Sequence, residues 1–200
     1  IMSKEQTVDL NQIKTGGTFL TNVVGSEKVF CKELFSEEEK MIYEAMRDFA
    51  TNELLPLSQN ELNKKDEKLI RKLVEQMGEL GFLGIDVPEK YGGSEMTKTG
   101  MCILAEGISF CGSPSFCTVW NVQTSIGSLG IIWYGNDEQK QKWLPGICSG
   151  EKIAAFGLTE PEAGSDATNS KTTGVLSDDG KHYVLNLSLI HISEPTRLAW

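Results

Sequence analysis

From Ser36 onward, hydrophobic and polar residues repeat with the period of an α-helix. The stretch SEEE that starts at Ser36 is a capping box, in which the serine caps the third amide and Glu39 reaches back. Apolar residues then fall on one predicted helix face: Met41, Ile42, Ala45 and Phe49. Pro56 disfavours helical geometry at the residue before it, so this helix is predicted to end at 54–55.

A second helix is predicted from a continuous apolar stripe with charged residues on the opposite face. The stripe consists of Leu69, Ile70, Leu73, Val74, Met77 and Leu80. Gly81 follows where a glycine commonly ends a helix. The glycine-rich stretch GFLGIDVPEKYGGS then predicts a structured connector.

Three more helices are predicted after the connector. One runs from about Thr97 to Phe110, and another begins at Asn136 and stops at Pro145. Between them, Ser113 and Pro114 are a serine N-cap and a first-turn proline. That helix is apolar nearly all round through Trp133, so we expect one central buried helix. Its expected core aromatics are Trp120, Trp133 and Tyr134.

The hydrophobic period changes at Ile153, where KIAAFGL predicts a strand. A β-hairpin is predicted from Lys171–Ser177 and Lys181–Leu185, with its turn at Asp178–Gly180. Helices followed by strands indicate an α+β fold: an all-α domain, then the start of a β-barrel-like middle domain. The expected divisions are an extension (1–33), a helical domain (34–150), a partial β domain (151–186) and a tail (187–200).

Composition narrows the function classes. The chain has 200 residues, of which 40% are hydrophobic and 24% charged, as in soluble globular proteins. Its net charge of −9 and the lack of a Lys/Arg run argue against nucleic-acid binding. No segment reaches the roughly 20 apolar residues of a membrane span. The five cysteines lack the spacing of zinc ligands, so we expect free thiols and no metal.

Both ends of the chain look unnatural. LSLIHISEPTR, residues 187–197, resembles one reading frame of a sequencing-library adapter. We therefore expect a non-native tail from Leu187 and assign no function to His191 or Trp200. The genuine sequence is then expected to stop near Asn186, and an isoleucine precedes the first methionine.

The familiar nucleotide-binding and hydrolase motifs are missing from the sequence. Outside the tail His182 is the only histidine, and its place beside a turn favours a solvated side chain. Glu106 is either a solvated residue or a buried acid facing a cavity.

The stretch AAFGLTEPEAGSD, residues 154–166, has stronger chemical character. Thr159 and Ser165 offer hydroxyls, Pro161 keeps Glu160 extended, and Gly164 allows close backbone approach. Such a loop suits the edge of a planar heteroaromatic ring or a phosphate, although a plain polar turn has similar composition.

LTEPEAGSD closely resembles the flavin-site signature of the acyl-CoA dehydrogenases. GFLGIDVPEKYGG, GNDEQKQKWLPGICSGEKIAAF and DGKHYVLN agree with this family in order and spacing, so the resemblance covers about residues 35–186. GGTFL and QTSIGSLGI are most similar to the branch acting on long and very long acyl chains. After YVLN the family continues differently, with a glycine and a flavin-stacking Trp-Ile-Thr/Ser segment.

The resemblance implies a helical N-terminal domain, a middle β domain and a C-terminal helical bundle, with FAD as cofactor. It implies that Thr159 offers its hydroxyl to the flavin ring, and that Ser165 touches both FAD and the acyl-CoA substrate. The implied cofactor-binding residues are Phe156, Gly157, Leu158, Thr159, Glu160, Pro161, Gly164 and Ser165. The family's catalytic glutamate lies in the bundle, beyond residue 200, so no catalytic residue is assigned.

The implied reaction is α,β-dehydrogenation of an acyl-CoA thioester in fatty-acid β-oxidation. Implied partners are an electron-transfer flavoprotein and further copies of the chain, as a dimer or tetramer. The expected location is the bacterial cytoplasm, or the mitochondrial matrix if the source is eukaryotic. The alternatives are an acyl-CoA oxidase of the same fold and a non-catalytic helical interaction module. We expect the isolated chain to be inactive.

Overall fold

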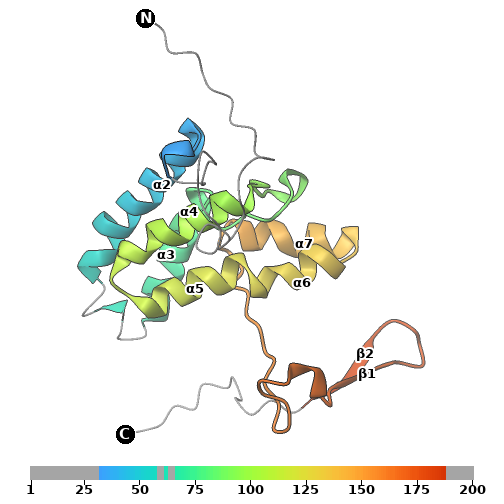
Figure 1. The fold of residues 1–200 in the computed structure, drawn as a ribbon. Coiled ribbons are helices and arrows are strands. Elements are labelled where there is room, and N and C mark those ends of the chain that lie inside the picture. The colour runs from blue at the N-terminus through green and yellow to red at the C-terminus, as the bar shows by residue number, and fades with distance from the viewer. Residues whose placement is uncertain (1–31, 58–60, 63–65, 188–200) are drawn as a thin grey trace, which may run out of the picture.

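The computed structural model describes residues 32–57, 61–62 and 66–187. Its helices pack together, and a connector leads from them to a two-stranded antiparallel sheet that stands apart (Figure 1). Helices followed by strands confirm the predicted α+β class. The predicted extension 1–33 and tail 187–200 lie outside the described residues, apart from residues 32, 33 and 187.

The first long helix, α2 (Glu37–Phe49), begins at the predicted capping box. The Ser36 hydroxyl accepts a hydrogen bond from the Glu39 amide at 3.1 Å, and the Ser36 amide donates to the Glu39 carboxylate at 2.9 Å. A wide π-type turn (Ala50–Leu54) and a 3-10 turn (Leu55–Leu57) follow, so the regular helix ends before Pro56 as expected.

The predicted buried face of α2 was partly wrong. Met41 is 63% exposed and Ala45 is exposed, whereas Met46 is fully buried. The reason is α4 (Lys98–Ile108), which lies against α2 and brings a glycine, Gly107, next to Met46. The side of α2 that faces α4 is therefore the buried one, and it includes Met46.

The second predicted helix is α3 (Glu67–Glu79), which is capped by Asp66. Leu73, Val74 and Met77 are buried as predicted, whereas Leu80 at the end of the stripe is 52% exposed. Gly81 follows the C-cap Leu80 in the left-handed region, with φ of 76°.

The predicted central helix is two helices, α5 (Pro114–Thr124) and α6 (Ile126–Tyr134). The backbone breaks at Ser125, whose φ of −126° and ψ of −104° are not helical. Ser125 and Thr124 both donate their hydroxyls to the Asn121 carbonyl, which offers the backbone an alternative to regular helical bonding.

Two of the three expected core aromatics are at the surface. Trp120 is buried in α5, where its indole N–H donates to the Phe82 carbonyl at 3.0 Å. Trp133 and Tyr134 in α6 are 63% and 85% exposed. These two side chains stay exposed because no described segment packs over them.

The last helix, α7 (Asp137–Cys148), begins at Asn136 in a second capping box. Pro145 lies inside its last turn, so the prediction that this proline stops the helix was wrong by one turn. The main core lies between α2, α3, α4 and α5. A smaller apolar cluster joins α7 to Val87 and Tyr91, which lie in the glycine-rich segment 81–94 after α3.

The predicted hairpin is confirmed. β1 (Thr173–Leu176) pairs antiparallel with β2 (Tyr183–Asn186), with Val175 opposite Val184. The predicted strand at Ile153 is not formed, because no strand of the described residues runs beside 153–158 to exchange ladder hydrogen bonds with it.

Candidate functional site

The candidate loop, residues 154–166, lies in the connector between the helices and the hairpin (Figure 1). The chain leaves α7 through Gly150, whose φ of 80° lies in the left-handed region. A side chain there would also meet the backbone of Val74 at 2.7 Å. Glycine is therefore required at the point where the chain turns from the helices toward the loop.

Gln123, a buried residue of α5, fixes the start of the loop. Its amide nitrogen donates to the carbonyls of Ile147 at 2.9 Å and Lys152 at 2.8 Å. Its carbonyl oxygen accepts from the Ala154 amide at 2.7 Å. One side chain thus joins α5, the end of α7 and the loop.

Glu160 fixes the middle of the same loop. Its carboxylate accepts hydrogen bonds from the Lys171 amide at 2.6 Å, from the Thr172 amide at 3.2 Å and from the Thr172 hydroxyl. Its backbone exchanges two hydrogen bonds with that of Ala163, at 3.1 and 3.2 Å. The turn at 160–163 is therefore tied to the residues that lead into β1.

The donors around Glu160 stabilise its charged form. The Thr172 hydroxyl, followed by the Lys171 amide, holds the pKa of the Glu160 carboxyl below its ordinary value. The residue is only 7% exposed, yet hydrogen bonds replace the water that its carboxylate has lost. Glu160 is thus a structural anion in the loop.

Between and beyond these anchors, the loop presents its groups outward. Phe156 and Leu158 are 54% and 44% exposed, and Thr159 is half-buried. Gly164 has open space where a side chain would stand. The structure gathers the predicted site residues in one short segment; Gly157, Pro161, Gly164 and Ser165 are all exposed.

Sequence reasoning missed Gln123 and Thr172 as parts of the loop's framework. The available signal for Gln123 was its place on the same predicted helix face as the apolar residues Phe116 and Trp120. Of the two open assignments for Glu106, the structure favours the solvated one: its side chain is 43% exposed and forms an ion pair with Lys32. His182 is exposed beside the hairpin turn, as expected.

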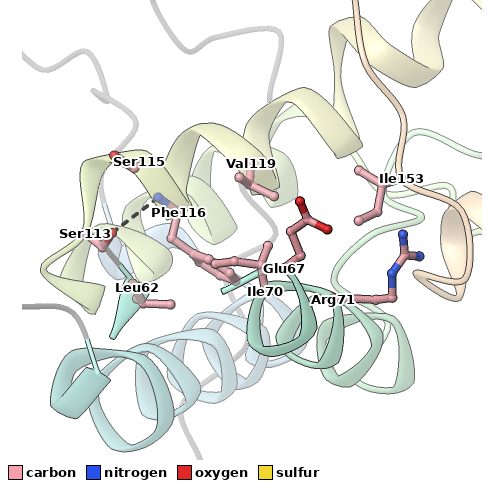
Figure 2. Close-up of a pocket in the computed structure, with 9 residues that line it drawn as sticks. All are labelled: Leu62, Glu67, Ile70, Arg71, Ser113, Ser115, Phe116, Val119 and Ile153. Carbon is pink, nitrogen blue, oxygen red and sulfur yellow. Dashed lines mark hydrogen bonds between the residues drawn. The ribbon is translucent and has the colours of Figure 1, made fainter. Parts of the chain in front are cut away.

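A groove of about 370 Å³ lies between the first turns of α3 and α5 (Figure 2). Phe116 and Ile70 meet across it, and Glu67 and Arg71 project from α3 toward Ile153. Its lining consists of Leu62, Glu67, Ile70, Arg71, Ser113, Ser115, Phe116, Val119 and Ile153. None of the predicted flavin-site residues lines this groove.

Within the described ranges, no group of three or more His, Cys, Asp or Glu side chains is placed to hold a metal ion. None of the helices in those same ranges combines the length and the apolarity that a bilayer crossing requires.

A family model described as "Acyl-CoA dehydrogenase, N-terminal domain" matches residues 36–151, more than half of the chain. The chain belongs to the acyl-CoA dehydrogenase family. It is 43% identical over 173 residues to a probable acyl-CoA dehydrogenase of Bacillus subtilis, covering 86% of this chain and 29% of the relative. It is 36% identical over 164 residues to the mitochondrial very long-chain specific acyl-CoA dehydrogenase of Bos taurus. That match covers 82% of this chain and 23% of the relative.

The same relationship holds in three dimensions. The crystal structure of an acyl-CoA dehydrogenase complexed with FAD from Bacillus anthracis is 45% identical and superposes with a TM-score of 0.72. That match covers 78% of this chain and 26% of the other. The acyl-CoA dehydrogenase chain described here thus spans less than a third of the length of these relatives.

Proposed function

We propose that this chain forms one wall of the FAD site of an acyl-CoA dehydrogenase that introduces an α,β double bond into acyl-CoA thioesters. The observation that carries the proposal is the loop at 156–165, which exposes amides and hydroxyls on a backbone anchored at Ala154 and Glu160. Support comes from the family and from the FAD bound in the Bacillus anthracis relative.

The loop fits one edge of a planar heteroaromatic group. Phe156 and Leu158 offer exposed apolar contact, and the hydroxyls of Thr159 and Ser165 offer hydrogen bonds. The open space at Gly164 lets a ligand approach the backbone. The proposed contact residues are Phe156, Gly157, Leu158, Thr159, Pro161, Gly164 and Ser165, with Ser165 also touching the acyl-CoA.

When bound, FAD supplies the acceptor for the substrate's β-hydride. The chain's own part is to bind and orient that group, while a carboxylate base removes the α-proton. Glu160 does not suit this role, because its oxygens already accept hydrogen bonds from Lys171 and Thr172. Glu106 is paired with Lys32. We therefore propose none of the described carboxylates as the base.

We also infer that residues 34–150 and 151–186 belong to two domains. The end of α7 at Cys148 and the family-model match to 36–151 support this division. For the protein as a whole we propose a homo-oligomer in fatty-acid β-oxidation that passes electrons to an electron-transfer flavoprotein. We also propose a preference for longer acyl chains, which rests on the resemblance of GGTFL and QTSIGSLGI to the branch acting on long and very long acyl chains.

The test uses the gene product that contains this chain, from which bound flavin is first removed. FAD is titrated back into the wild type and into Thr159→Val, and the dissociation constants are compared. Loss of one hydrogen bond of about 1 kcal/mol predicts an increase of about fivefold in the dissociation constant. Addition of acyl-CoA without oxygen should bleach the flavin absorbance of the wild type.

Thr118→Val is the matched control, because Thr118 is exposed on α5 and donates only to its own helix, at the Pro114 carbonyl. Its dissociation constant should equal that of the wild type. A wild-type protein that binds no FAD, or a flavin that acyl-CoA leaves oxidised, would refute the proposed function.

A further inference from the structure

Glu160 stands out among the predicted cofactor-binding residues because its side chain is turned into the protein. It is the only charged residue in the described ranges that is buried, at 7% exposure, within a loop whose other members are mostly exposed. Its carboxylate faces Lys171 and Thr172, which lead into β1. The carboxylate oxygens are thus engaged by donors of the protein itself, on the side that leads into β1.

The donor set around Glu160 is specific for a carboxylate. Two backbone amides and one hydroxyl, all donors, converge on its two oxygens. Glutamine, which has one oxygen and one NH₂ group, would place a donor against the Lys171 or Thr172 amide. Aspartate is one methylene shorter and would not reach both residues with the loop in the same place.

The same residue also shapes the loop through its backbone. The paired hydrogen bonds between Glu160 and Ala163 close the turn through Pro161 and Glu162, and the Asn169 side-chain amide donates to the Glu162 carbonyl at 3.2 Å. Thr159 and Ser165 flank this closed turn. Their positions therefore depend on where Glu160 holds the turn relative to the hairpin.

We propose that Glu160 is a positioning residue of the flavin site: its carboxylate, bound to Lys171 and Thr172, fixes the loop so that Thr159 and Ser165 meet the cofactor. This inference rests on the proposed function. It replaces direct cofactor contact, which the resemblance implied for Glu160, with an action through the hairpin.

The first experiment needs no cofactor. Amide hydrogen exchange of Lys171 and Thr172 is measured by NMR in the 200-residue chain, for the wild type and for Glu160→Gln. Loss of the carboxylate should speed exchange of both amides by about tenfold or more. Glu162→Gln is the matched control, because Glu162 is exposed, lies two residues away and uses only its backbone carbonyl. Its exchange rates should equal those of the wild type.

The second experiment separates positioning from contact. FAD dissociation constants and flavin absorbance spectra are measured for the flavin-bearing gene product with Glu160→Gln, Thr172→Val or Thr172→Ser. Glu160→Gln and Thr172→Val should each raise the dissociation constant about tenfold and shift the spectrum in the same way. Thr172→Ser keeps the hydroxyl and should restore wild-type binding. The double variant should bind no worse than Glu160→Gln alone, because both changes disrupt the same contact between Glu160 and Thr172.

The possible outcomes are distinct. If the wild type binds FAD and Glu160→Gln weakens it while Thr172→Val does not, Glu160 acts by direct contact and the inference is overturned. Unchanged exchange of the two amides in Glu160→Gln would overturn it as well. If the wild type binds no FAD, the proposed function fails and the positioning role fails with it, whatever the exchange data show.

Discussion

Replacement of Gln123 by leucine should destabilise the helical domain strongly, although the two side chains are similar in size. Gln123 is 1% exposed. Its side-chain amide donates hydrogen bonds to the carbonyls of Ile147 and Lys152 and accepts one from the amide of Ala154. Leucine removes the Gln123 hydrogen bond from all three backbone groups, although the Ile147 carbonyl also accepts from the Gly150 amide at 3.3 Å. A buried polar group that loses its hydrogen bond costs about 1–3 kcal/mol.

The Ile147 carbonyl contact is fully buried, whereas the contacts with Lys152 and Ala154 are partly buried, so water can replace part of what they lose. The Ile147 carbonyl keeps the Gly150 amide, so each of the three groups costs about 1–2 kcal/mol, the lower half of that range, and the expected loss is about 3–6 kcal/mol. This is a large part of the roughly 5–15 kcal/mol by which a typical domain is stable.

The assay is urea unfolding of the 200-residue chain, followed by tryptophan fluorescence, to which buried Trp120 contributes. With a slope of about 1–3 kcal/mol per molar urea, the transition midpoint should fall by at least about 1 M. Gln141→Leu is the matched control: Gln141 is exposed on α7, and the same substitution should change stability by less than about 0.5 kcal/mol. If Gln123→Leu changes stability no more than this control, the anchoring role of Gln123 is wrong.

Two further predictions test packing and burial. Gly93→Ala would place a methyl group 1.9 Å from the Val87 carbonyl oxygen, so thermal unfolding should show a loss of about 3 kcal/mol or more in the free energy of unfolding. Gly130→Ala is the control: the α6 surface is open there, and the free energy of unfolding should rise by about 0.5–1 kcal/mol. Burial raises the pKa of the Cys117 thiol to about 12 and that of Cys148 to about 11. Iodoacetamide at pH 8 should therefore label exposed Cys102 before Cys117 and Cys148, as mass spectrometry can follow. Labelling of Cys117 as fast as Cys102 at this pH would show that its thiol is not buried.

Local signals in the sequence were sufficient for the helix starts and for the hairpin. Ser36, Asn136 and Ser113 cap their helices as predicted, because a cap is a contact between residues about three positions apart. The turn at Asp178–Gly180 is equally local, and Gly180 has the positive φ of 67° that favours glycine. These interactions do not depend on the rest of the fold.

Burial was harder to predict because it depends on which surfaces meet. The pattern of α2 gave a helix but not its buried face, since that face is selected by Gly107 on α4, about 60 residues away. The apolar run through Trp133 predicted one buried helix, yet α6 leaves that side chain 63% exposed. The run at 153–158 predicted a strand, and a strand requires a neighbour that the described residues do not provide.

The two anchors of the candidate loop show the same distinction within one site. Gln123 binds groups 24 to 31 positions along the chain, and Glu160 binds groups 11 and 12 positions along it. Neither pairing follows a helical or strand period, so no pattern in the sequence reveals it. What the sequence does show is a glutamine on the helix face of Phe116 and Trp120, and an acid directly before the proline of a short turn. A polar residue that breaks its local pattern is therefore a useful candidate for a structural anchor, and hydrogen-bond geometry then distinguishes it from a ligand-binding residue.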